Sequence, residues 1–151
     1  MTACWTDNRN TVSVSRGPLT YSLQIKEEYR RSGGTDAWPA WDIFPASPWN
    51  YGLAADTASN FTVVKAAWPA DDQPFRNEAA PVKLTATARK IPNWTLDPRG
   101  AVNEVVQQPV KSSEPEESVT LIPMGAARLR IAAFPVIDNG PDSKDWPVTE
   151  N

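Results

Sequence analysis

The stretch Leu19-Thr20-Tyr21-Ser22-Leu23-Gln24-Ile25-Lys26 alternates strictly between apolar and polar residues. Successive side chains of an extended strand point to opposite faces, so this period of two predicts a β-strand with one buried face. Similar alternation recurs in five further segments, at 11–15 and 82–89 and more weakly at 61–65, 119–122 and 128–131. No apolar pattern of helical spacing extends beyond about ten residues. We therefore predict an all-β fold, an antiparallel β-sandwich of the jelly-roll type.

Glycine and proline punctuate the gaps between these segments. Fifteen prolines disfavour long helices. Turns are predicted at Arg16-Gly17-Pro18, Arg31-Ser32-Gly33-Gly34, Asp97-Pro98-Arg99-Gly100 and Pro123-Met124-Gly125. The polar segment 111–118 has no residue suited to a core and predicts a solvated loop. We expect one domain over residues 1–151, with a core at about 11–135 and a loosely held polar tail at 138–151.

Charge and hydropathy exclude two classes of partner. The chain has 15 Lys and Arg against 18 Asp and Glu, a net charge of −3, with no basic run of the kind that binds phosphates. Its apolar runs are too short to span a bilayer, and its first ten residues lack a signal-peptide core. We expect neither nucleic acid nor membrane as a partner. The compartment stays open: cytoplasmic by default, but periplasmic or secreted if the chain belongs to a larger precursor.

The chain lacks most familiar catalytic groups. It has no histidine and one cysteine, Cys4, so it cannot build a Cys/His zinc site, a disulfide or a histidine-based nucleophile system from its own residues. Two carboxylate pairs are the remaining candidates: Glu27 and Glu28, which point to opposite faces of a strand end, and Asp71 and Asp72 in a polar turn. Both pairs are interpreted as solvated. We expect no catalytic residue, no metal site and no cofactor.

Seven tryptophans are an unusual load for 151 residues. Exposed rings of this kind stack on sugars or anchor interfaces, whereas buried ones fill a core. Two proline-stiffened segments, 38–41 and 47–51, carry the candidate carbohydrate or interdomain contacts Trp38, Trp41, Trp49, Asn50 and Tyr51. The alternative for the second segment is a structural corner whose Trp and Tyr pack inside.

Four segments carry a resemblance to a known family, in this order: VSVSRGPLTYSL at 12–23, FPASPWNYGL at 44–53, PVKLTATARKIPNW at 81–94 and VTLIPMGAARLRIAAFP at 119–135. Together they resemble the C-terminal β-sandwich region of glycoside hydrolase family 127, the β-L-arabinofuranosidase-like proteins. The resemblance spans about residues 11 to 135. The ordered set of RGPL, SPWNYGL, an Arg-x-x-Pro-x-Trp step and a closing RLRI is fairly specific.

The resemblance implies an accessory domain. In that family an (α/α)6 barrel holds a cysteine nucleophile and a zinc bound by cysteines and a glutamate, and no position of this chain matches that motif. The first hypothesis is therefore a non-catalytic domain that supports or packs against a catalytic barrel. The alternative is a free-standing module that binds plant-type oligosaccharides through exposed Trp and Tyr. An autonomous glycosidase is a third hypothesis, and a homodimer would be another way to cover an apolar face.

Overall fold

A computed structural model of the chain describes residues 2–54, 61–106 and 110–137. In this part of the chain there are ten strands and two short 3-10 turns. They are β1 (Thr2–Trp5), η1 (Thr6–Asn8), β2 (Thr11–Arg16), β3 (Leu19–Leu23), β4 (Glu27–Gly34), β5 (Pro39–Pro45), β6 (Tyr51–Ala54), β7 (Thr62–Lys65), β8 (Val82–Lys90), β9 (Glu116–Pro123), η3 (Met124–Ala126) and β10 (Val136–Ile137). The predicted all-β class is confirmed.

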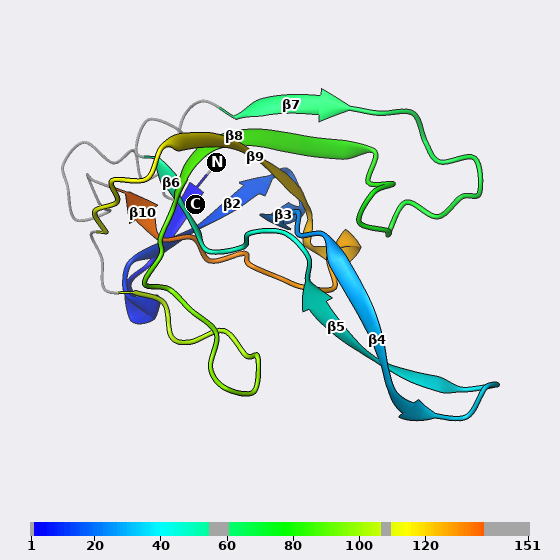
Figure 1. Cartoon of the computed structure of the whole chain (residues 1–151). Helices are drawn as coiled ribbons and strands as arrows, with labels where there is room; N and C mark the ends of the chain where they lie inside the picture. The colour runs from blue at the N-terminus through cyan, green and yellow to red at the C-terminus, as the bar shows by residue number, and fades with distance from the viewer. Residues whose placement is uncertain (1, 55–60, 107–109, 138–151) are drawn as a thin grey trace.

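Eight strands form one curled, mostly antiparallel sheet, in the order β1-β2-β3-β9-β8-β6-β10 with β7 paired to β8 (Figure 1). The long strand β8 pairs with β9 along one edge. Its other edge is shared, because β7 pairs with 82–85 and β6 pairs with 88–90. Among the strands of the described residues, the pair β10 and β6 alone is parallel.

The segment before β10 closes the sheet on itself. Phe134 forms an antiparallel bridge with Val12 of β2, with N–H···O distances of 2.8 and 2.9 Å in the two directions. Immediately after it, the Leu53 N–H of β6 donates to the Pro135 carbonyl at 2.9 Å. Residues 134–137 thus link β2 to β6, and strand pairing runs in a circuit around one core.

The core follows the predicted period of two. In β8 the side chains of Leu84, Ala86 and Ala88 are buried, while the residues between them are only partly covered. Tyr21 and Leu23 of β3 are buried as predicted, but Leu19, at the turn that opens this strand, is 40% exposed. Alternation therefore identified the inward face of β8, but in β3 the polar Ser22 is buried as well, and in β2 so are Thr11 and Ser13.

Backbone approach inside the core is tight at Gly52 of β6. A β-carbon built there would lie 2.6 Å from Ile137 Cδ1 and 3.0 Å from Ile91 Cδ1. Both neighbours are themselves buried. Glycine at this position lets β6 and β10 approach closely.

Several boundaries differ from the sequence predictions. Residues 128–131 form no strand, although the Ile131 carbonyl accepts a hydrogen bond from the Leu23 N–H at 2.9 Å. The predicted turn at 31–34 is the end of β4, and 116–118 of the predicted loop begin β9. In the first of these two cases the backbone pairs with the neighbouring strand β5 of the same hairpin, and in the second with β8, which is distant in sequence. The predicted tail 138–151 lies outside the described residues.

The strands β4 and β5 form a separate two-stranded hairpin that projects from the sheet (Figure 1). All residues from 28 to 42 are exposed. At its turn Gly34 has φ +74°, and a β-carbon there would lie 2.2 Å from the Trp38 carbonyl oxygen, so only glycine fits. The hairpin therefore has solvent on both faces over most of its length.

Candidate functional site

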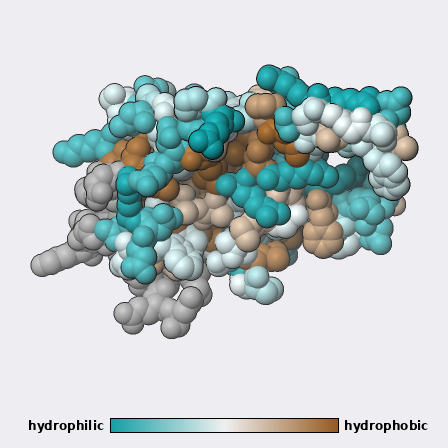
Figure 2. All heavy atoms as spheres, turned by 90° about the horizontal axis from the view of Figure 1, so that it is seen from below, coloured by the Kyte–Doolittle hydropathy of each residue, from teal (hydrophilic) through white to brown (hydrophobic). Residues whose placement is uncertain are grey.

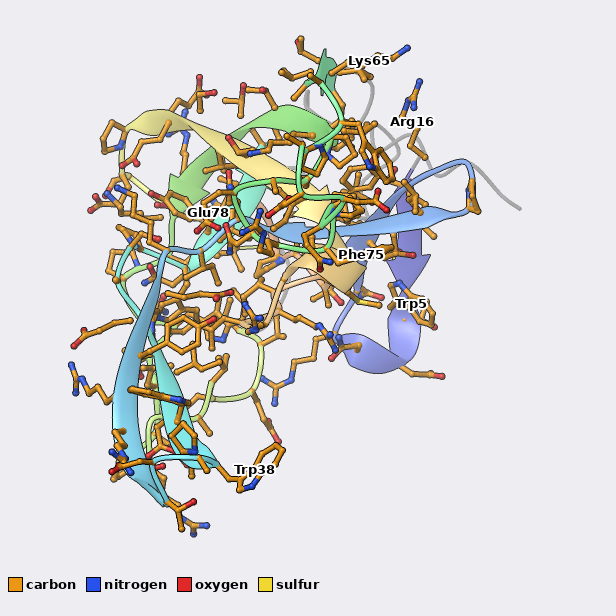
Figure 3. All side chains as sticks on the ribbon, turned by 90° about the vertical axis from the view of Figure 1, so that its right-hand side faces the viewer. Trp5, Arg16, Trp38, Lys65, Phe75 and Glu78 are labelled. Atoms are coloured by element: carbon orange, nitrogen blue, oxygen red, sulfur yellow. The ribbon has the colours of Figure 1, made fainter. Side chains whose placement is uncertain are left out.

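The five predicted contact residues fall into two groups. Trp38 and Trp41 belong to the projecting hairpin, with exposed fractions of 83% and 50%. Trp38 lies in the turn between β4 and β5, at the far end from the main sheet (Figure 3). Trp41 lies within β5, opposite Arg31. The segment 38–41 is thus the end of a hairpin and the start of its second strand, and not a long loop.

The second group forms a packed corner. Trp49 meets Trp94 edge to face, with ring centroids 5.2 Å apart. The Asn50 side-chain amide donates to the carbonyls of Ile91 and Trp94 at 2.9 and 3.3 Å, and Tyr51 is 6% exposed. These contacts correspond to the alternative interpretation, a corner whose aromatic residues pack inside.

The remaining tryptophans are divided between core and surface. Trp94 is buried, whereas Trp5 and Trp68 are exposed. Trp68 lies in the loop after β7 and donates its indole N–H to Asp72. Trp146 lies outside the described residues. In the view from below, hydrophobic residues gather in the middle of the face between hydrophilic margins (Figure 2).

A cleft of about 570 Å³ opens beside the base of the hairpin. The sequence did not point to it, because its residues come from four separate segments. It is lined by Leu23, Gln24, Lys26, Glu27, Ser47, Pro48, Tyr51, Asn77, Glu78, Ser118, Val119 and Thr120. Of the predicted contact residues, only Tyr51 lines it.

Asn77 holds this cleft together. It is buried, and its side-chain amide donates to the Ile25 carbonyl at 2.8 Å and to Glu27 Oε1 at 3.3 Å. The Gln24 side-chain amide donates to the backbone carbonyl of Asn77 at 2.9 Å and to Asn77 Oδ1 at 3.1 Å. These bonds lock the loop that follows β7 onto the link between β3 and β4, so one wall of the cleft is rigid.

The side chain of Glu27 is buried and hydrogen-bonded, and the sequence prediction of a solvated residue is wrong at this position. Its side chain is 6% exposed and accepts hydrogen bonds from the Tyr29 hydroxyl at 2.6 Å and from the backbone N–H of Arg128 at 3.3 Å. The Arg128 guanidinium lies 3.6 Å away and also donates to the Tyr29 hydroxyl at 2.8 Å. Burial alone would raise the pKa of Glu27, but these hydrogen bonds, that of Asn77 and the Arg128 charge together lower it.

Glu28, by contrast, is exposed on the other face of β4, where it pairs with Arg30. The opposite orientation predicted for the two neighbouring glutamates is therefore confirmed. Asp71 and Asp72 lie in an exposed turn, as expected, and Asp71 pairs with Arg76 at 2.5 Å.

A second charged cluster joins β6, β8 and β9. Glu117 accepts hydrogen bonds from the Tyr51 hydroxyl at 2.7 Å and from the Lys90 ammonium at 2.6 Å. The hydrogen bond from Lys90 is the main cause that lowers the pKa of Glu117. The pKa of Tyr51 is raised, mainly because the hydroxyl is buried and also because it donates to Glu117. This cluster fixes the orientation of Tyr51 behind the cleft.

The Glu27 carboxyl group does not have the properties of a general acid. A glycosidase needs a carboxylic acid whose pKa is raised, yet the pKa of Glu27 is lowered and both its oxygens accept hydrogen bonds. Among the described residues no group of three or more His, Cys, Asp or Glu side chains could hold a metal ion. No helix in the described part of the chain has the length and apolar character to cross a bilayer.

Comparison with known proteins gave no match: no family model, no curated protein and no solved structure is similar to this chain at a significant level.

Proposed function

We propose that this chain is a non-catalytic accessory β-domain that packs against a separate catalytic (α/α)6 barrel of a family 127-like glycoside hydrolase. The observation that carries the proposal is the β4–β5 hairpin, whose residues 28 to 42 are all exposed and include Trp38 and Trp41. Large aromatic residues and arginines are the usual anchors of protein interfaces. The sequence resemblance supplies the identity of the partner.

The hairpin is ordered before it meets a partner. The Arg30 guanidinium pairs with Glu28 at 2.9 Å and lies 4.4 Å from the centre of the Phe44 ring. At the base, Glu27 ties β4 to Arg128. An element held in this way loses little conformational entropy on association, which favours a docking role.

The proposal is tested by measuring the affinity of this chain for a separately produced (α/α)6 domain of a family 127-like enzyme, by isothermal titration calorimetry. We expect Trp38→Ala and Trp41→Ala each to weaken binding by about 30-fold or more, which corresponds to the roughly 2 kcal/mol at which interface hot spots begin. Trp68→Ala is the matched control, since Trp68 is 61% exposed but lies outside the hairpin. Absence of binding, or an equal loss with Trp68→Ala, contradicts the proposal.

A second candidate function is a free-standing carbohydrate-binding module. It is favoured by the same two exposed indoles, because aromatic rings in solvent can stack on the apolar faces of sugars. Intrinsic tryptophan fluorescence titrated with plant-type oligosaccharides distinguishes the two functions. A saturable fluorescence change that Trp38→Ala abolishes supports the carbohydrate-binding module. An unchanged fluorescence in folded protein supports the docking function of the hairpin.

A further inference from the structure

We propose that the cleft at the base of the hairpin is a binding site for a neutral saccharide unit. The inference does not depend on the docking function, because the cleft residues are not those of the exposed hairpin end. Its volume of about 570 Å³ lies within the roughly 300–1,000 Å³ typical of small-molecule sites.

The charges around the cleft favour a neutral ligand. Three charged side chains line it: Lys26, Glu27 and Glu78. Glu27 is already balanced by Arg128, which leaves one ammonium and one carboxylate. Within the described residues neither Lys26 Nζ nor the Glu78 carboxylate has a hydrogen-bond or ion-pair partner. These two remaining charges cancel, so a ligand without net charge is favoured.

The hydrogen-bonding groups suit a ligand rich in hydroxyls. Besides the two charged groups, the cleft offers the hydroxyls of Ser118 and Thr120, which donate to no side chain or backbone group in the described part of the chain. The Gln24 side-chain oxygen likewise accepts no hydrogen bond there, since only its amide nitrogen is engaged by Asn77. Sugar hydroxyls both donate and accept, so they can use such a mixed set.

An apolar wall completes the site. Leu23, Pro48, Tyr51 and Val119 line the cleft together with the polar groups. A sugar ring presents C–H groups as well as hydroxyls, and it therefore needs both kinds of surface. Tyr51 is held by Glu117 and the Asn77 loop by Gln24 and Glu27, so the groups that line the cleft are positioned before a ligand enters.

The site is tested by ¹H–¹⁵N NMR titration of the full chain. The neutral probes are methyl α-L-arabinofuranoside and methyl β-D-galactopyranoside, and the charged and zwitterionic probes are D-galacturonate and L-serine. We expect saturable shifts of the backbone amides at 24, 26, 78 and 118–120 with at least one neutral probe, at a dissociation constant of about 1 mM. Galacturonate should bind at least about fivefold more weakly, because the charges that line the cleft cancel. L-Serine is the control for a ligand whose two opposite charges pair with Lys26 and Glu78.

Two variants localise the binding. Glu78→Ala and Thr120→Ala should each lower the affinity for the neutral probe by at least about fivefold, because each removes one hydrogen bond to the ligand. Glu28→Ala, which removes an exposed carboxylate from the opposite face of β4, and Trp38→Ala should leave the affinity unchanged. No saturable shift with either neutral probe, tighter binding of galacturonate or serine, or loss of binding only with Trp38→Ala overturns the proposal. The last outcome would place the sugar on the hairpin instead.

Discussion

The closed sheet and the β4–β5 hairpin are made of the same kind of strand but are stabilised in different ways. In the sheet, Leu53, Leu121 and Phe134 have no exposed surface, so apolar burial drives its formation. In the hairpin, residues 28 to 42 are all exposed, and cross-strand pairs with a polar anchor at Glu27 hold it in place. The difference separates the part that maintains the fold from the part that is available for contact.

The largest expected effect is in the sheet, where Phe134→Ala should lower the free energy of unfolding by about 3–5 kcal/mol. Phe134 is fully buried and its backbone pairs with Val12, so the truncation leaves a cavity at the point where the sheet closes. Urea denaturation followed by tryptophan fluorescence measures the change. A loss below about 1 kcal/mol would mean that closure contributes little to stability.

A smaller effect is expected from Gly52→Ala, which should cost about 1–3 kcal/mol because the new methyl group overlaps the Ile137 side chain. The matched control lies in the hairpin: at Gly33 a β-carbon would meet nothing within 4 Å, so Gly33→Ala should be near neutral. The comparison of the two urea midpoints tests whether the sheet alone is closely packed. Equal effects would contradict that distinction.

Acidic pH should destabilise the protein through Glu27 at the base of the hairpin. Because the pKa of folded Glu27 lies below its ordinary value of 4.5, its carboxylate stabilises the fold above that pH and loses this contribution as the pH falls through the lowered value. Glu27→Gln should destabilise the protein by about 1–3 kcal/mol at pH 7 and by less at an acidic pH below the lowered pKa, where the wild-type carboxyl is protonated. Urea midpoints at the two pH values provide the measurement.

Glu28→Gln is the control for this pH dependence. Glu28 pairs with Arg30 on the exposed face of β4, where an ion pair contributes little. Its removal should change the urea midpoint at either pH only slightly. If Glu28→Gln and Glu27→Gln behave alike, then Glu27 is not the anchor of the hairpin.

The smallest effect is expected at the hairpin end, where Trp38→Ala should change the free energy of unfolding by no more than about 0.5 kcal/mol. The ring is 83% exposed, so its removal uncovers little of the protein. Differential scanning calorimetry of this variant beside wild type checks the prediction. A large loss would show that Trp38 supports the fold and would remove the main argument for a docking surface.

Sequence patterns were most informative where one face of a strand is buried. Alternation identified β2, β3 and β8, and in β8 the buried and partly covered residues alternate as the pattern predicts. It missed β4 and β5, since both their faces are exposed and no hydrophobic period results. It also overpredicted a strand at 128–131, where apolar and basic residues alternate but the backbone finds no ladder partner.

The sequence alone determined the all-β class and the division of β8 into buried and outward residues, because both depend on local side-chain periodicity. Tertiary structure decided which aromatic residues face solvent and where the cleft forms. Trp38 and Trp94 each lie close to proline in the sequence, yet one is 83% and the other 2% exposed. Likewise, Gln24, Asn77 and Thr120 meet only because strand pairing brings distant segments together, which no local pattern records.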